Sequence, residues 1–158
     1  MSLPFTTAQF LAVFAAYNAA IWPLQMVAYA LGLLVLAALF WRNVFAMRLI
    51  LFILALMWAV NGIAYHFTFF APVNPAAKLF AVLFVVQALL FGASALAQDG
   101  LKFQIGGDIR SAIGLLVIFY SMVIYEALGY AASHGLMAGP MFGVAPCPTT
   151  LFTIGRSI

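Results

Sequence analysis

The sequence predicts an all-α polytopic membrane protein, and three observations lead to this fold class. Hydrophobic residues make up 68% of the 158 residues and charged residues only 6%, whereas soluble domains are about half apolar and about a quarter charged. Four apolar stretches are each close to the roughly 20 residues that a spanning helix needs. Their apolar character is continuous rather than alternating, which favours helices over the strands of a β-barrel.

The scarcity of charge excludes several classes of function. Six Lys/Arg and three Asp/Glu side chains cannot cover the surface of a soluble enzyme, and a chain this apolar is not disordered. The net charge of +3 is not clustered, so no nucleic-acid partner is expected. The single cysteine, Cys147, excludes an internal disulfide and CxxC motifs. Because P-loop, HExxH and GxSxG motifs are also absent, we expect neither an enzyme nor a cofactor.

The first predicted element is a helix over residues 6–20, which ends before Pro23 because proline interrupts a helix. Its mixed polarity, without a basic segment before it, predicts an interfacial helix rather than a signal peptide. A continuous, kinked start of the first span is the alternative. Four complete spans are then predicted over residues 24–41, 49–70, 79–97 and 111–130.

The C-terminal residues 148–158 are predicted to start an incomplete fifth span. Pro148 suits the first position of a helix, but the residues that follow are too few to cross a bilayer. Arg156 would then lie at membrane depth, where an arginine costs about 2.5–3.5 kcal/mol. Either the last residues do not insert, or the natural segment is longer, which is the interpretation we favour. The chain is predicted to be a single membrane domain.

Five cations predict the orientation of the helices. Arg42 and Arg48 follow the first span and Lys102 and Arg110 follow the third, whereas Lys78 lies on the opposite side. Cytoplasmic loops are enriched in Lys and Arg. We therefore expect the N-terminus to lie on the periplasmic side.

Three stretches of the sequence are too specific to be generic membrane sequence. They are Tyr17-Asn-Ala-Ala-Ile-Trp-Pro23, Trp58-Ala-Val-Asn-Gly-Ile-Ala-Tyr-His66 and Pro146-Cys-Pro-Thr-Thr150. Over essentially the whole chain, the sequence resembles a bacterial multi-pass membrane family of unknown function (domain of unknown function 6064). The resemblance implies the bacterial inner membrane and one or two further spans, but no activity. It implies no role for Glu126, where the family tends to have proline.

Ionisable and polar side chains inside spans are costly, so each is a candidate functional residue. The predicted orientation places His66, Glu126, His134 and Cys147 at the periplasmic face. No comparable set is predicted at the cytoplasmic face, where the ionisable groups are ordinary loop charges. The predicted clustering therefore depends on the orientation.

Each candidate also has a purely structural interpretation. His66, expected to share a helix face with Asn61 and Tyr65, would bind a metal, carry a proton, or hydrogen-bond to another helix. Glu126 would carry a proton, or its carboxylate would reach the outer water. Gln87 would meet a solute or hydrogen-bond between helices.

Cys147 is the sharpest candidate. Lying between two prolines, it is expected at the N-cap of the last helix, where the helix dipole favours a thiolate. Thr149 and Thr150 add hydroxyls to the first turn. Together with His66 and His134, the thiol would suit zinc or copper, although the spacing matches no metal motif. In the structural interpretation, the prolines brace the helix start and the cysteine is a small apolar filler.

Three classes of function remain open. The first is small-solute transport past Asn61, His66 and Gln87. The second is a structural or partner-binding protein, homo-oligomers included, in which these residues brace helices. The third is a periplasm-facing thiol or soft-metal site built on Cys147, His66 and His134. In all three, the chain lies in the lipid bilayer.

Overall fold

The structure, a computed structural model, describes residues 5–41, 43–97, 108–133 and 138–157. The all-α fold class is confirmed, since the regular elements of these residues are helices. In chain order they are α1 (Thr7–Ala20), α2 (Leu24–Ala38), α3 (Val44–Val60), the π-helix η1 (Asn61–Phe70), α4 (Ala77–Leu96), α5 (Ile109–Phe119), the π-helix η2 (Tyr120–Ile124), α6 (Tyr125–Ser133) and α7 (Pro146–Ser157).

Three helices of the described residues are long and apolar enough to cross a membrane. They are Val44–Phe70, which joins α3 to η1, then Ala77–Leu96, and Ile109–Ala132, which joins α5, η2 and α6. The starts of the first and the third follow from the sequence: the side chains of Asn43 and Asp108 accept backbone N–H bonds as N-caps, as these residue types commonly do.

The first predicted span is shorter than expected. α2 has 15 residues and is joined to α1 through a bend of 84°. A membrane-length helix is reached only if α1 and α2 count together as one bent span, so the described residues hold three or up to four candidate spans. Pro23 lies at this break, as expected for a residue that cannot continue a helix.

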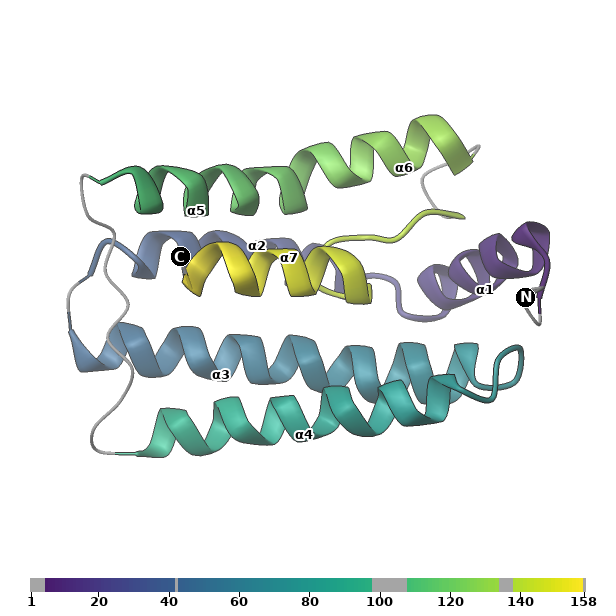
Figure 1. Ribbon diagram of the computed structural model, residues 1–158, viewed down its shortest axis with the longest axis horizontal. Coiled ribbons are helices and arrows are strands. Elements are labelled where there is room, and N and C mark those ends of the chain that lie inside the picture. Colours follow the sequence, from purple (N-terminus) through teal and green to yellow (C-terminus); the bar gives the residue numbers. More distant parts are fainter. Residues whose placement is uncertain (1–4, 42, 98–107, 134–137, 158) are drawn as a thin grey trace.

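Consecutive long helices run in opposite directions (Figure 1). α3 packs on α4, while α5 and α6 form the opposite side of the molecule, and α7 lies between them. The main core lies where α2, α3 and α7 meet, around Val35, Leu54, Phe142 and Phe152. η1, α6 and the start of α7 lie toward the end of the molecule that also holds α1 (Figure 1).

The N-terminal helix packs on protein rather than standing apart. The rings of Phe14 and Tyr65 stack at 5.0 Å, and that of Tyr17 meets Tyr65 at 5.4 Å. The outward positions of α1 carry small or polar residues instead of large apolar ones. An interfacial helix normally turns large apolar residues toward lipid, but those of α1 cover one end of the other helices.

The last helix begins two residues earlier than predicted, at Pro146 instead of Pro148. Both prolines fit, because residues in a first helical turn need no intrahelical N–H partner. α7 is built into the fold: Thr149 and Phe152 are fully buried. A Cβ on Gly155 would lie 2.8 Å from the carbonyl oxygen of Gly114, so α7 and α5 are in backbone contact there.

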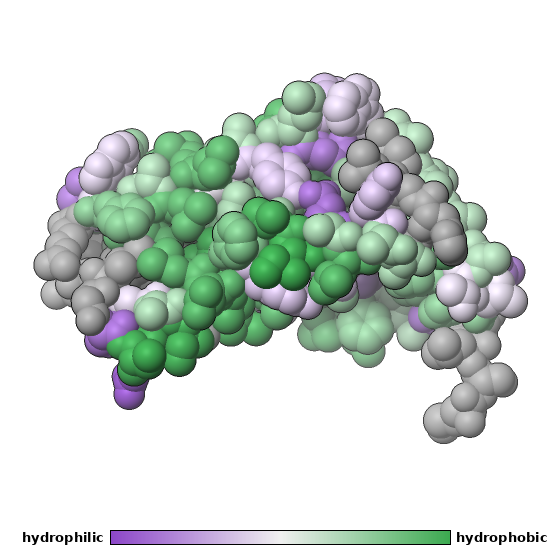
Figure 2. All heavy atoms as spheres, turned by 90° about the horizontal axis from the view of Figure 1, so that it is seen from above, coloured by the Kyte–Doolittle hydropathy of each residue, from purple (hydrophilic) through white to green (hydrophobic). Residues whose placement is uncertain are grey.

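The outer surface is mostly apolar. Large hydrophobic side chains are exposed on α2, α3, α4, α5 and α6, and Figure 2 shows hydrophobic residues covering much of one face, with hydrophilic residues near the two ends and in a smaller group near the middle. A soluble monomer rarely exposes so much contiguous apolar surface. These helices suit contact with a lipid bilayer.

Candidate functional site

Polar side chains from several helices meet around residues 139–149, which we call the elbow. It consists of the non-helical connection before α7 and the first turn of α7. Gly139 and residues 141–145 are buried although they are not helical. Non-helical backbone at membrane depth is tolerated only where protein or water satisfies its polar groups, so the backbone polar groups of the elbow need hydrogen-bond partners.

The N-terminal part of the chain supplies the first set of donors. The Tyr17 hydroxyl donates to the Val144 carbonyl at 2.8 Å, and the Asn18 amide donates to the Gly139 carbonyl at 2.9 Å. Gln25 of α2 donates in turn to the Asn18 carbonyl at 2.8 Å. α1 is thereby fastened to a segment more than 100 residues away in the chain.

Asn61, at the junction of α3 and η1, is the central residue of the elbow. Its fully buried side-chain amide nitrogen donates toward the carbonyls of Met57 at 2.8 Å and Gly143 at 3.2 Å, and toward the Thr149 hydroxyl at 3.2 Å. The Thr149 hydroxyl donates to the Ala145 carbonyl at 2.8 Å. The sequence analysis singled out Asn61 and Thr149, and the structure brings them together.

A second connection ties the middle of α7 to α3. The Trp58 indole N–H donates to the Thr153 hydroxyl at 2.9 Å, and this hydroxyl donates to the Thr149 carbonyl at 2.8 Å. The Trp58 ring also stacks on Phe84 of α4 with centroids 4.5 Å apart. Thr150 is half-buried, and its hydroxyl donates to the Pro146 carbonyl at 2.8 Å. These threonines therefore serve the backbone of α7.

Gly143 allows the elbow to approach α2 closely. Its φ of +73° lies in the left-handed region, which residues with a side chain adopt at a cost. A Cβ at this position would lie 2.7 Å from the Cβ of Ala28. Only glycine meets both conditions without a shift of the backbone.

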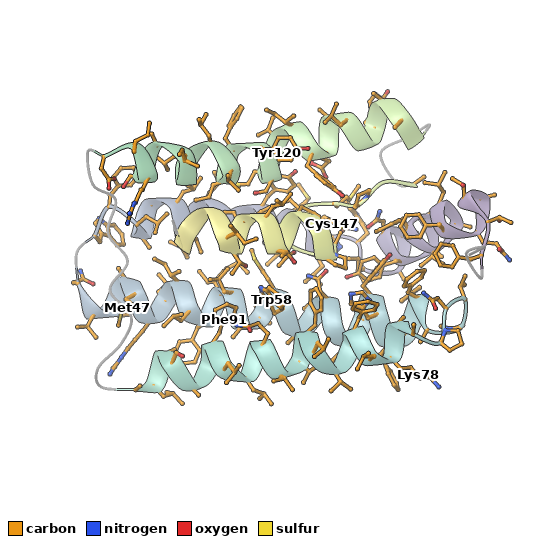
Figure 3. The ribbon with its side chains drawn as sticks, viewed as in Figure 1. Met47, Trp58, Lys78, Phe91, Tyr120 and Cys147 are labelled. Atoms are coloured by element: carbon orange, nitrogen blue, oxygen red, sulfur yellow. The ribbon has the colours of Figure 1, made fainter. Side chains whose placement is uncertain are left out.

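Cys147 is the second residue of α7, so its prediction as the N-cap was wrong. The thiol is exposed and lies near the hydroxyl groups of Tyr125 and Tyr65. Figure 3 shows Cys147 at the start of α7. Because Pro146 and Pro148 have no N–H groups, the first turn of α7 offers fewer free donors than an ordinary helix start.

His66 faces away from the elbow. Its buried ring lies 4.8 Å from the Phe84 ring and 5.8 Å from the Phe80 ring, both on α4. Neither ring nitrogen has a hydrogen-bond partner among the described residues. Asn61, Tyr65 and His66 lie about one turn apart in the π-helix η1 and are all buried. They contact different neighbours, since Asn61 bonds to the elbow, Tyr65 stacks on α1 and His66 packs against α4.

The predicted metal ligands are only partly described. His66 contacts α4, whereas Cys147 lies near Tyr125 at the start of α6, and His134 lies outside the described residues. Within the described part of the chain, no three His, Cys, Asp or Glu side chains are placed to share a metal ion. A zinc or copper site that includes His134 stays a prediction.

Glu126 is half-buried and joins α6 to α2. Its carboxyl group hydrogen-bonds with the Tyr29 hydroxyl, which also donates to the Met122 carbonyl at 2.8 Å. The sequence analysis did not single out Tyr29, nor Tyr17 and Trp58, because aromatic residues with a polar atom are common near membrane interfaces. Asn18 and Gln25 gave a usable signal, since amides are rare in apolar helices.

Two apolar grooves among the described residues are not lined by the residues predicted to meet a solute. Gln87 is half-buried on α4. Two grooves, of about 50 Å³ between α2, α3 and the elbow and about 250 Å³ between η1 and α4, are lined by apolar residues and glycine. Neither is lined by Asn61, His66 or Gln87.

Comparison with known proteins identifies the family. Residues 7–157 match the model of a family of unknown function, DUF6064. The chain belongs to DUF6064. This confirms the resemblance seen in the tyrosine–proline, tryptophan–histidine and PCPTT stretches. No curated protein and no solved structure matches the chain.

The DUF6064 match covers the elbow and every side chain that binds it. Tyr17, Asn61, Thr149 and Thr153 all lie within the matched residues. The family has no described function, so it assigns none of them a role. Their hydrogen bonds and surroundings in the structure indicate what they do.

Proposed function

We propose that this DUF6064 chain is an integral membrane protein of the structural or partner-binding class, rather than a solute transporter. One observation carries the proposal: several buried or half-buried polar side chains of the helices hydrogen-bond to the elbow or to α7. Tyr17, Asn61 and Trp58 bond to the elbow or to α7. A transport path would need polar groups facing an open passage, usually near the middle of the membrane.

We also propose the inner membrane of a bacterium, four spans, and an N-terminus on the periplasmic side. The support for the orientation is the distribution of cations. Arg48 and Arg110 lie at one end of the described helices, whereas Lys78 lies at the end that holds α1 (Figure 3). Cytoplasmic loops are the basic ones, so the elbow and Cys147 would lie on the outer side. The α1–α2 pair would provide the remaining span.

A cysteine scan tests the proposed class. Cys147 is the only cysteine, so Cys147→Ala gives a cysteine-free chain. Gln87→Cys and Ser121→Cys, one at a time in this background, probe half-buried and buried positions within the helices, and Lys78→Cys probes an exposed position at one end. We expect a charged methanethiosulfonate reagent to label only Lys78→Cys. Labelling at both Gln87→Cys and Ser121→Cys would indicate a water-filled passage and would refute the structural class.

The native cysteine tests the orientation. Intact cells producing the unmodified chain are treated with an impermeant maleimide, and Cys147→Ala serves as the control for background labelling. Because the Cys147 thiol is exposed, we expect labelling without permeabilisation. Labelling that appears only after the inner membrane is opened would reverse the proposed orientation.

A further inference from the structure

The oxygen atoms around Asn61 outnumber the protons available to them. The Asn61 amide nitrogen has two N–H groups and three oxygen acceptors within 3.2 Å. The Thr149 hydroxyl uses its own proton on the Ala145 carbonyl. The Asn61 side-chain oxygen Oδ1 is buried and has no donor among the described residues. Buried acceptors are almost always satisfied, so this oxygen calls for an additional donor.

Exchanging the two ends of the Asn61 amide does not solve the problem. The exchange would place Oδ1 in the position now held by the amide nitrogen, which is 2.8–3.2 Å from three oxygen atoms. Oxygen acceptors this close repel one another unless a proton lies between them, and Thr149 has already donated its proton. The nitrogen therefore belongs at the centre of the acceptors, and Oδ1 points elsewhere.

The surroundings decide which kind of ligand fits. An anion is excluded by the acceptors themselves, and Pro146 and Pro148 remove N–H donors that a helix start would otherwise offer an anion. A cation would meet the positive end of the α7 dipole, and none of the residues bonded to Asn61 is a carboxylate that could offset it. A neutral ligand with two protons is compatible with both conditions.

We infer that the elbow holds a bound water molecule that donates to Asn61 Oδ1. The Gly143 carbonyl and the Thr149 hydroxyl each keep a second lone pair, so a water in this position has the two to four polar partners that a buried water needs.

Met57 is a built-in reporter for this water. Its side-chain methyl carbon lies 3.4 Å from where a Cβ on Gly143 would be, and the residue is 2% exposed. X-ray radiolysis turns a bound water into a hydroxyl radical that oxidises a neighbouring methionine to the sulfoxide. Met47 is 8% exposed and serves as the matched control away from the elbow, toward the other end of α3 (Figure 3).

The experiment compares oxidation rates by mass spectrometry in the detergent-solubilised chain. We expect Met57 to be oxidised several-fold faster than Met47, although Met57 is the more buried of the two. In Asn61→Leu, Met57 should fall to the rate of Met47, while the rate of Met47 stays unchanged and shows that the chain is folded. If Asn61→Leu does not fold, the unmodified chain alone remains decisive. A Met57 rate no higher than that of Met47 overturns the inference. A Met57 rate that is high in choline chloride and low in sodium chloride would assign the site to an alkali cation and would also overturn it.

Discussion

Replacing Gly143 by alanine is the most direct test of how the elbow packs. The substitution forces a residue with a side chain into φ of +73°, which costs about 1–2 kcal/mol. It also brings two Cβ atoms to 2.7 Å, and overpacking of this kind costs typically about 1–3 kcal/mol. We therefore expect Gly143→Ala to lower the free energy of unfolding by about 2–5 kcal/mol.

A double-mutant cycle separates the two contributions. Ala28→Gly removes the Cβ that the new methyl group would meet, at a cost of about 1 kcal/mol as a glycine inside a helix. The pair should therefore be coupled by about 1–3 kcal/mol, because the overlap is relieved while the backbone strain remains. The assay is denaturant unfolding in a fixed detergent, followed by tryptophan fluorescence.

Two outcomes would refute this reasoning. Additive effects of Gly143→Ala and Ala28→Gly would show that the residues do not touch. A loss for Gly92→Ala as large as that for Gly143→Ala would show that the assay responds to any alanine. Gly92 is the matched control, because its Cβ would meet nothing within 4 Å and alanine there should stabilise α4 by about 0.5–1 kcal/mol.

Three further predictions concern other contacts. Gly155→Ala should lower the melting temperature and loosen α7 from α5, because the added Cβ would lie 2.8 Å from the Gly114 carbonyl oxygen. This overlap costs about 1–3 kcal/mol, and unchanged stability would contradict the contact. Thr153→Val should cost about 1–3 kcal/mol in the same assay, because it leaves the Trp58 N–H without its acceptor, and no loss would refute that bond. Hydrogen bonds from Ser111 hold the pKa of Asp108 below its ordinary value of 3.8. The ionised Asp108 carboxylate therefore stabilises the fold fully above that pH, and this stabilisation is lost as the pH falls through the lowered pKa. Asp108→Asn, measured by unfolding across this pH range, should remove that part of the pH dependence, and an unchanged profile would contradict the prediction.

The positions of the long helices could be predicted from hydropathy. The ranges 49–70, 79–97 and 111–130 all fall within or close to helices of the structure, because apolar length is a local property that each segment carries by itself. The first range was less accurate, since α2 ends at Ala38. Hydropathy does not reveal that α1 and α2 meet at 84°, because that angle is set by what α1 packs against.

Some residues of the candidate site could be predicted from the sequence, but not which residues contact each other. Asn61 and Thr149 stood out as polar residues beside apolar runs, yet their contact joins residues 88 apart in the chain. Tyr17 and Trp58 were missed because their roles depend on hydrogen bonds to distant residues, to the Val144 carbonyl and the Thr153 hydroxyl. The helical periodicity also did not reveal the neighbours, since His66 packs against α4 whereas Asn61 bonds to the elbow.

The sequence by itself determined the family, the all-α class and the apolar helices of this protein. The reason is physical: the cost of placing a polar residue in lipid is paid residue by residue, so it is visible in the composition of each segment. Only the tertiary structure decided that α7 is packed between α3 and α5, and that the polar side chains converge on the elbow. A buried hydrogen bond is satisfied by whichever atom lies within reach, and that depends on how distant segments meet.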